Sequence, residues 1–187
     1  MYRGEIMFLW VGAVFENNAE DEIRSITNKL NENYNLSTVV FSLPQHISLK
    51  ISFECDDYKK VIDYIKTQLS VFESFDVEIS DVSKIDGSLI WLDISENETL
   101  RKIHDLLNYS LLRDFNIPLK SFDGDEFKFH STLFFDSSIN EKHQALIDEF
   151  KKHFLLPRKY VIKKIKFAIS QTLTPGEFEV VDMIVLD

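Results

Sequence analysis

The chain has 187 residues and a formal net charge of −10 at pH 7, and 44% of its residues are hydrophobic. This composition predicts a single domain over residues 1–187 with a sizeable core, and the charge argues against a protein that coats long nucleic acid. Its single cysteine, Cys55, excludes a disulfide within the chain and a cysteine-rich zinc site, which suits the reducing cytoplasm.

The first predicted element is a strand over the apolar run of residues 6–15. Arg3 precedes this run, as a basic residue precedes the core of a signal peptide, and that alternative stays open. The run is too short to span a membrane, and no small-residue cleavage site follows it. We therefore favour a buried strand and expect no association with a membrane.

Hydrophobic periodicity and turn residues predict the elements that follow. They are a helix from residue 18, a strand over 36–43, a strand from His46, a helix capped by Asp56 or Asp57, and strands over 75–82 and 89–94 joined by Asp86-Gly87. The second part of the chain contains a helix with the capping box Ser95-x-x-Glu98, a loop over 118–126, a strand over 127–135, a helix with the capping box Ser138-x-x-Glu141, and strands over 160–173 and 178–186.

Two of these strands carry a histidine and a hydroxyl residue on one face. In the strand after Pro44, Ile47 and Leu49 alternate with His46 and Ser48, so the polar pair shares the face opposite the apolar residues. The same pattern returns 84 positions later.

The second strand places His130 and Thr132 on one face. Each histidine strand is followed by a helix, a strand, a turn with glycine and another strand. The 41 residues from His46 to Gly87 match the 46 residues from His130 to Gly176. We interpret this pattern as an internal duplication whose second half begins near 118–127. The predicted fold class is α+β, or mixed α/β, with both histidines in one groove about a pseudo-twofold axis.

The two motifs, His46-Ile47-Ser48-Leu49 and His130-Ser131-Thr132-Leu133, resemble those of the 2H phosphoesterase superfamily, which includes the bacterial 2′-5′ RNA ligase-like proteins and cyclic phosphodiesterases. The resemblance implies a bilobal fold of two antiparallel-rich sheets flanked by helices with a central groove. It also implies catalysis without a metal or other cofactor. The implied substrate is a 2′,3′-cyclic nucleotide or RNA terminus, or a 2′-5′ linkage, and hydrolysis is favoured over ligation.

The chemistry of the residues agrees with that activity. Opening a cyclic phosphodiester needs a base for the attacking water and an acid for the leaving oxygen, and histidine serves either role near neutral pH. His46 and His130 are therefore the candidate catalytic pair, with the assignment of acid and base left open. Ser48 and Thr132 are candidate phosphate-binding residues, because their hydroxyls can donate to non-bridging oxygens.

Other side chains are candidates for binding the substrate. Simple alternation puts Lys50, Lys128 and Phe134 on the histidine faces, so the lysines could hold a phosphate and Phe134 could stack on a base. No arginine follows the second motif, unlike some members of the family. Phe134 could equally belong to the core.

Several alternatives remain open at this stage. The motifs could belong to a module that binds a nucleotide or RNA end without turning it over, or the two histidines could merely line a polar sheet face. His104 is expected at the edge of the core, and Asp123-Gly124-Asp125-Glu126 is expected to be a turn rather than a metal loop. Residues 151–166 hold seven basic side chains and no acidic one, which predicts either a solvated surface or attraction for an RNA end. The expected partner is a small nucleotide or RNA end, and the expected state is a monomer.

Overall fold

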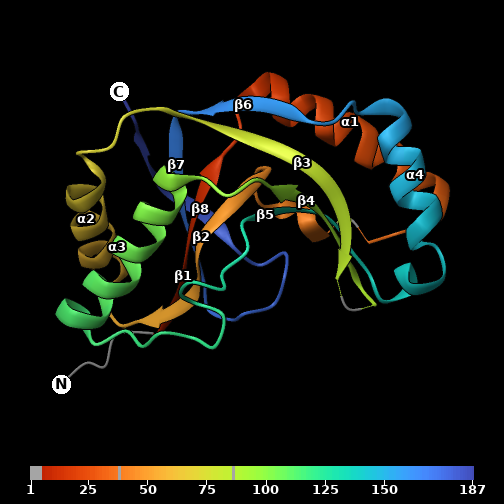
Figure 1. Ribbon diagram of the computed structural model, residues 1–187. Helices are drawn as coiled ribbons and strands as arrows, with labels where there is room; N and C mark the ends of the chain where they lie inside the picture. Colours follow the sequence, from red (N-terminus) through yellow and green to blue (C-terminus); the bar gives the residue numbers. More distant parts are fainter. Residues whose placement is uncertain (1–5, 38, 86) are drawn as a thin grey trace.

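The computed structural model describes residues 6–37, 39–85 and 87–187. Within these residues the chain forms two four-stranded antiparallel sheets (Figure 1). The first sheet has the order β2-β1-β7-β8 and consists of β1 (Met7–Val14), β2 (His46–Cys55), β7 (Lys164–Ser170) and β8 (Glu179–Val185). The second has the order β5-β4-β3-β6 and consists of β3 (Phe75–Ile85), β4 (Leu89–Ile94), β5 (His130–Phe135) and β6 (Arg158–Ile162). The predicted mixed α/β fold with two antiparallel sheets is confirmed.

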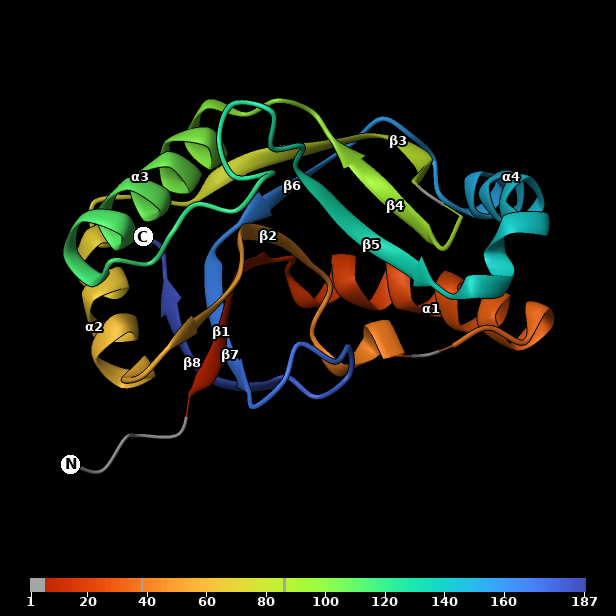
Figure 2. The same cartoon turned by 90° about the horizontal axis from the view of Figure 1, so that it is seen from below.

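Two helices cover the outer face of each sheet. The helices are α1 (Asn17–Tyr34), α2 (Tyr58–Leu69), α3 (Glu98–Phe115) and α4 (His143–His153). Both views show α2 and α3 together on one side of the molecule and α1 with α4 on the other (Figures 1 and 2). Lys66 of α2 forms an ion pair with Asp182 of β8, and Glu22 of α1 forms one with Arg158 of β6. The helices thus leave the inner faces of both sheets available to form a groove.

Each sheet draws strands from both sides of the 118–126 loop, because β3 and β4 join β5 and β6, whereas β7 and β8 join β1 and β2. The unit that occurs twice in the fold consists of a strand, a helix, a histidine strand and a second helix. It occurs once as β1-α1-β2-α2 and again as β4-α3-β5-α4. In both copies the histidine strand pairs antiparallel with the strand that precedes it.

The helix caps differ in part from the predictions. The Asp57 side chain accepts from the backbone N–H of Lys60, which confirms one of the two predicted caps of α2. Neither predicted capping box forms. Asn97, rather than Ser95, caps α3, and Asp136 caps a short 3₁₀ helix, η2 (Ser137–Glu141), that precedes α4. In both cases the side chain of an Asn or Asp takes the capping position in place of the predicted serine. Its oxygen accepts from a free backbone N–H group of the first turn.

Two predicted strands are wrong. Residues 39–42 form a 3₁₀ helix, η1 (Val39–Ser42), and the side chains of Val39 and Val40 line a pocket instead of joining a sheet. The strand predicted over 160–173 is two strands, β6 and β7, which separate at Lys163 and enter different sheets. Asp86 of the predicted hairpin turn lies outside the described residues, and Gly87 has a φ of 58°, which favours glycine.

The core is continuous between both sheets and the four helices. His104, which was expected at the edge of the core, is fully buried within it. None of the helices in the described ranges is long and apolar enough to cross a membrane.

Candidate active site

The two motif histidines are the first residues of β2 and β5, and both are held in the same way. Nδ1 of His46 donates to the carbonyl of Pro44 (2.7 Å), and Nδ1 of His130 donates to the carbonyl of Lys128 (2.8 Å). Because a carbonyl can only accept, Nδ1 carries the proton in each neutral ring and Nε2 is the basic atom. Neither Nε2 has a hydrogen-bond partner in the described part of the chain.

A tryptophan from the neighbouring strand flanks each histidine, which the sequence did not predict. Trp10 of β1 meets the ring of His46 edge-on at 4.6 Å, and its indole N–H donates to Oγ of Ser48 (3.3 Å). Trp91 of β4 stacks on His130 with a centroid distance of 3.9 Å. The indole of Trp10 lies across Gly12, where a Cβ atom would come within 2.0 Å of the ring. Any side chain at this glycine would therefore displace Trp10.

The register of β2 explains why Lys50 does not face the groove. Ser48 lies opposite Gly12, but Lys50 lies opposite Val11, the preceding residue of β1. Leu49 is therefore an extra residue, a β-bulge, and the side-chain alternation reverses behind it. Val11 faces the core, and Lys50 faces it too, with 1% of its surface exposed. The prediction that Lys50 contacts the substrate is wrong.

The same irregularity occurs at the same place in β5. Thr132 lies opposite Trp91, whereas Phe134 lies opposite Ile90, so Leu133 is the extra residue. Phe134 consequently points into the core and is fully buried, so the prediction that it stacks on a base is also wrong. Phe135 lies nearer the groove instead and lines a pocket with Thr132.

A buried polar network supports the bulge in β2. The ammonium group of Lys50 donates to Oδ1 of Asn108 (2.6 Å) and forms an ion pair with Asp123 (2.8 Å), and neither side chain of that pair is exposed. Burial lowers the pKa of Lys50, and Asp123 offsets part of that effect. His104 donates from Nδ1 to the carbonyl of the bulged Leu49 (2.8 Å).

One side chain joins the two motifs directly. Gln45 precedes His46, and its amide nitrogen donates to Oγ of Ser131 (2.6 Å) and to the carbonyl of Thr132 (3.0 Å). The backbone N–H of Gln45 donates to Glu20, which also pairs with Arg24. Gln45 is 6% exposed. Nothing in the local sequence pattern distinguishes this glutamine, because both of its partners are more than 80 residues away.

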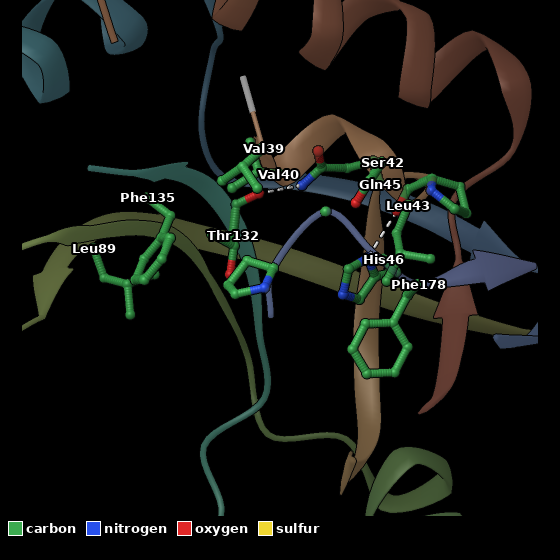
Figure 3. A pocket seen from close by; sticks show the side chains of 13 residues that line it. Val39, Val40, Ser42, Leu43, Gln45, His46, Leu89, Thr132, Phe135 and Phe178 are labelled. Atoms are coloured by element: carbon green, nitrogen blue, oxygen red, sulfur yellow. Dashed lines mark hydrogen bonds between the residues drawn. The ribbon is translucent and has the colours of Figure 1, made fainter. Parts of the chain in front are cut away.

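Two pockets adjoin the motifs. A pocket of about 200 Å³ is lined by His46 and Thr132 together with mainly apolar side chains. Figure 3 shows His46 and Phe178 at one end of this pocket and Leu89 and Phe135 at the other. A second pocket, of about 870 Å³, contains His130 and the exposed residue Lys128 in its lining.

Burial lowers the pKa of both histidines, but the charged groups around them differ. Burial lowers the pKa of His46 to about 4, although the hydrogen bond to Pro44 opposes the shift, and the nearby charges of His130 and Arg24 reinforce it. Burial also lowers the pKa of His130, while its hydrogen bond to Lys128 and the negative charge of Asp93 oppose the change. The imidazolium form is therefore less unfavourable at His130.

The basic run of residues 151–166 is largely neutralised by acidic neighbours. Four of its seven basic residues form ion pairs, namely Lys151 with Asp81, Lys152 with Glu149, Arg158 with Glu22 and Lys159 with Glu78. Lys164 and Lys166 lie opposite Val14 and Gly12 of β1, on the sheet face that carries His46. No group of three or more His, Cys, Asp or Glu side chains in the described ranges is arranged to hold a metal ion.

Comparison with known proteins finds a matching family model and a relative that is named as a candidate phosphoesterase. A family model described as the 2′-5′ RNA ligase superfamily matches residues 15–184. A protein of Geobacillus sp. (strain WCH70), named as a candidate phosphoesterase, is 31% identical over 77 residues, and this alignment covers 38% of the chain and less than half, 44%, of that relative.

Solved structures share the fold at low sequence identity. The protein TT0787 of Thermus thermophilus superposes with a TM-score of 0.63 at 13% identity, over 96% of this chain and 97% of that one. LigT of E. coli, crystallised with 3′-AMP, gives 0.62 at 13% identity, with coverage of 97% and 99%. Usb1 of Kluyveromyces marxianus gives 0.52 at 13% identity over the whole of both chains.

Proposed function

Because the chain belongs to the 2′-5′ RNA ligase superfamily, we propose that it is a metal-independent phosphodiesterase that hydrolyses 2′,3′-cyclic phosphates or 2′-5′-linked nucleotides and RNA ends. The family and the fold support phosphoesterase or ligase-like activity in general. The substrate and the roles of the residues are the proposed part.

The proposal rests on the equivalent way in which the rings of His46 and His130 are held. Each ring is fixed through Nδ1 to a carbonyl of its own chain segment, two residues before it, so that each Nε2 remains available for proton transfer. One Nε2 takes a proton from the attacking water while the other gives a proton to the leaving oxygen. Neither step requires a metal-bound hydroxide.

The hydroxyl residues of the motifs would bind the phosphate. Oγ of Ser48 accepts a hydrogen bond from Trp10, so its own proton remains free to donate to a non-bridging oxygen. Thr132 lines the same pocket as His46 and can donate to a second oxygen. Such donors stabilise the negative charge that builds up in the transition state. Lys128 is exposed beside His130 and is the proposed cationic contact.

The test is turnover of 2′,3′-cyclic nucleotides and of a short RNA that ends in a 2′,3′-cyclic phosphate, with EDTA present and products resolved by phosphorus NMR. We expect His46→Ala and His130→Ala each to lower kcat by about 10²–10⁴-fold. His153→Ala, which changes an exposed histidine on α4, should leave kcat unchanged. Binding without turnover by the unaltered protein would instead favour a module that holds a nucleotide or RNA end. Full activity in either motif variant would refute the proposed pair.

A further inference from the structure

The two motif strands are alike, but the residues opposite their histidines differ. On β1, the residue directly opposite His46 is Val14, which is buried and apolar. On β4, the residue directly opposite His130 is Asp93. Directly opposite residues of an antiparallel pair lie on one face with their Cβ atoms about 4.5–5.5 Å apart, so the carboxylate and the imidazole are neighbours.

The side chain of Asp93 is fixed by two hydrogen bonds. Its Oδ1 accepts from the indole N–H of Trp91 (2.9 Å), and its Oδ2 accepts from the hydroxyl of Ser83. The same Trp91 ring stacks on His130 at 3.9 Å, so one indole holds both the imidazole and the carboxylate. A negative charge held at this position stabilises the protonated form of the histidine.

No such group supports a protonated His46 among the described residues. Its neighbours are the indole edge of Trp10 and the side chain of Val14, and the guanidinium of Arg24 acts on it as a like charge. Around His130 the other charged groups that line the pocket are Glu96, Arg101, Asp125, Glu126 and Lys128. Arg101 is already paired with Glu96. The charge environment thus favours a proton on His130 and disfavours one on His46.

The sizes of the two pockets favour the same assignment, with the leaving group on the side of His130 and the attacking water on the side of His46. The pocket that contains His130 holds about 870 Å³ and lies among Trp91, Phe122 and Phe129, which is enough for a nucleoside. The pocket that contains His46 holds about 200 Å³, which is small for a nucleoside but ample for water.

We infer that Asp93 is the positioning residue that makes His130 the proton donor, so that the leaving oxygen lies on the His130 side and water attacks from the His46 side. This inference rests on the proposed function. The step starts with His130 as the imidazolium and His46 as the neutral ring, and Nε2 of His46 takes a proton from the water as the water oxygen bonds to phosphorus. The bond from phosphorus to the leaving ribose oxygen breaks, and that oxygen takes the proton from Nε2 of His130. Proton exchange with solvent then restores both rings.

A pair of substrates separates the two roles. A 2′,3′-cyclic nucleotide releases an alkoxide that needs a proton, whereas a nucleoside p-nitrophenyl phosphodiester releases a stable phenolate that does not. We expect Asp93→Asn to lower kcat/KM by about 10–100-fold for the cyclic nucleotide and by less than about 3-fold for the p-nitrophenyl ester, as one weakened general acid should. His130→Ala should show the same selectivity, and His46→Ala should lose activity on both substrates.

Further variants separate this role from a structural one. Asp93→Asn should also move the alkaline limb of the pH profile of kcat/KM to lower pH, and Asp93→Glu should restore part of the rate. Asp182→Asn, on β8 of the other sheet, changes a carboxylate that pairs with Lys66 and should leave both rates unchanged. Should Asp93→Asn fail to fold, Ser83→Ala removes one hydrogen bond to the carboxylate and should show a weaker form of the same selectivity.

The outcomes distinguish a failure of the role inferred for Asp93 from a failure of the proposed phosphodiesterase activity on which that role rests. If the unaltered protein turns over both substrates but the Asp93 variants lose the same factor on each, the role of Asp93 is refuted and the phosphodiesterase stands. If His46→Ala spares the p-nitrophenyl ester, the acid and base are reversed. Absence of turnover of either substrate by the unaltered protein would overturn both proposals.

Discussion

The buried ion pair between Lys50 and Asp123 predicts a large loss of stability when the lysine is removed. In Lys50→Met the carboxylate of Asp123 would stay in the core without its counter-ion, because neither side chain of the pair is exposed. Oδ2 would keep only the backbone N–H of Lys120 (2.9 Å), and Oδ1 has no hydrogen-bond partner among the described residues. Breaking a buried pair from one side costs about 3–5 kcal/mol.

That cost is a large fraction of the total stability of a domain, which is about 5–15 kcal/mol. With a urea m value of about 2 kcal/mol/M, a loss of about 4 kcal/mol moves the unfolding midpoint down by about 2 M. The melting temperature should fall by about 8–16 °C for a chain of this length. Urea unfolding followed by tryptophan fluorescence, compared at equal m value, gives the free energy directly.

Two further variants serve as controls. Lys102→Met removes an exposed ion pair with Glu98 on α3 and should leave the unfolding midpoint almost unchanged, because solvent screens such a pair. Lys50→Met combined with Asp123→Asn removes both charges and keeps an acceptor for Lys120, so it should recover most of the lost stability. A Lys50→Met protein of unchanged stability but strongly raised KM would refute the reasoning, since the lysine would then face the substrate.

The remaining predictions concern charge. The lowered pKa of His46, about 4 in the folded protein against 6.5 in the unfolded chain, means that the unfolded chain binds more protons between these values. The free energy of unfolding should therefore fall as the pH drops through that window, by at most about 3 kcal/mol, and urea titrations of His46→Gln should lack that part of the slope. Replacing both Lys164 and Lys166 by alanine should raise KM for an oligonucleotide with a cyclic phosphate end about 3–10-fold more than KM for a cyclic mononucleotide. The same change at Lys151 and Lys152, which pair with acidic residues, is the control, and equal effects on both substrates would contradict a role in binding RNA.

The features that the sequence predicts well are local ones. Alternation over a few residues correctly predicts that His46 shares a strand face with Ser48, and that His130 shares one with Thr132, because both pairs precede the bulges. The cap of α2 at Asp57 is local in the same sense, since it lies three residues from its partner Lys60.

The features that the sequence fails to predict depend on distant partners. Lys50 and Phe134 follow a bulged leucine, and the bulges are defined by pairing with β1 and β4, not by the motif strands themselves. One extra residue reverses the side chains that follow it until the next irregularity, so extrapolating the alternation gives the wrong face for Lys50 and Phe134. Asp93 could have been noticed only by aligning β4 against β5 in the correct register.

The bridge that Gln45 makes to Ser131 and Thr132 has a mechanical consequence for the reaction. It connects the edge strands β2 and β5, which belong to different sheets, at the point where the two histidine strands begin. If one sheet moves relative to the other to admit or release a nucleotide, this bridge would be the pivot of that motion. Because atoms near a pivot move least, such a motion would open the outer walls of the groove while the spacing between the two imidazoles changed little.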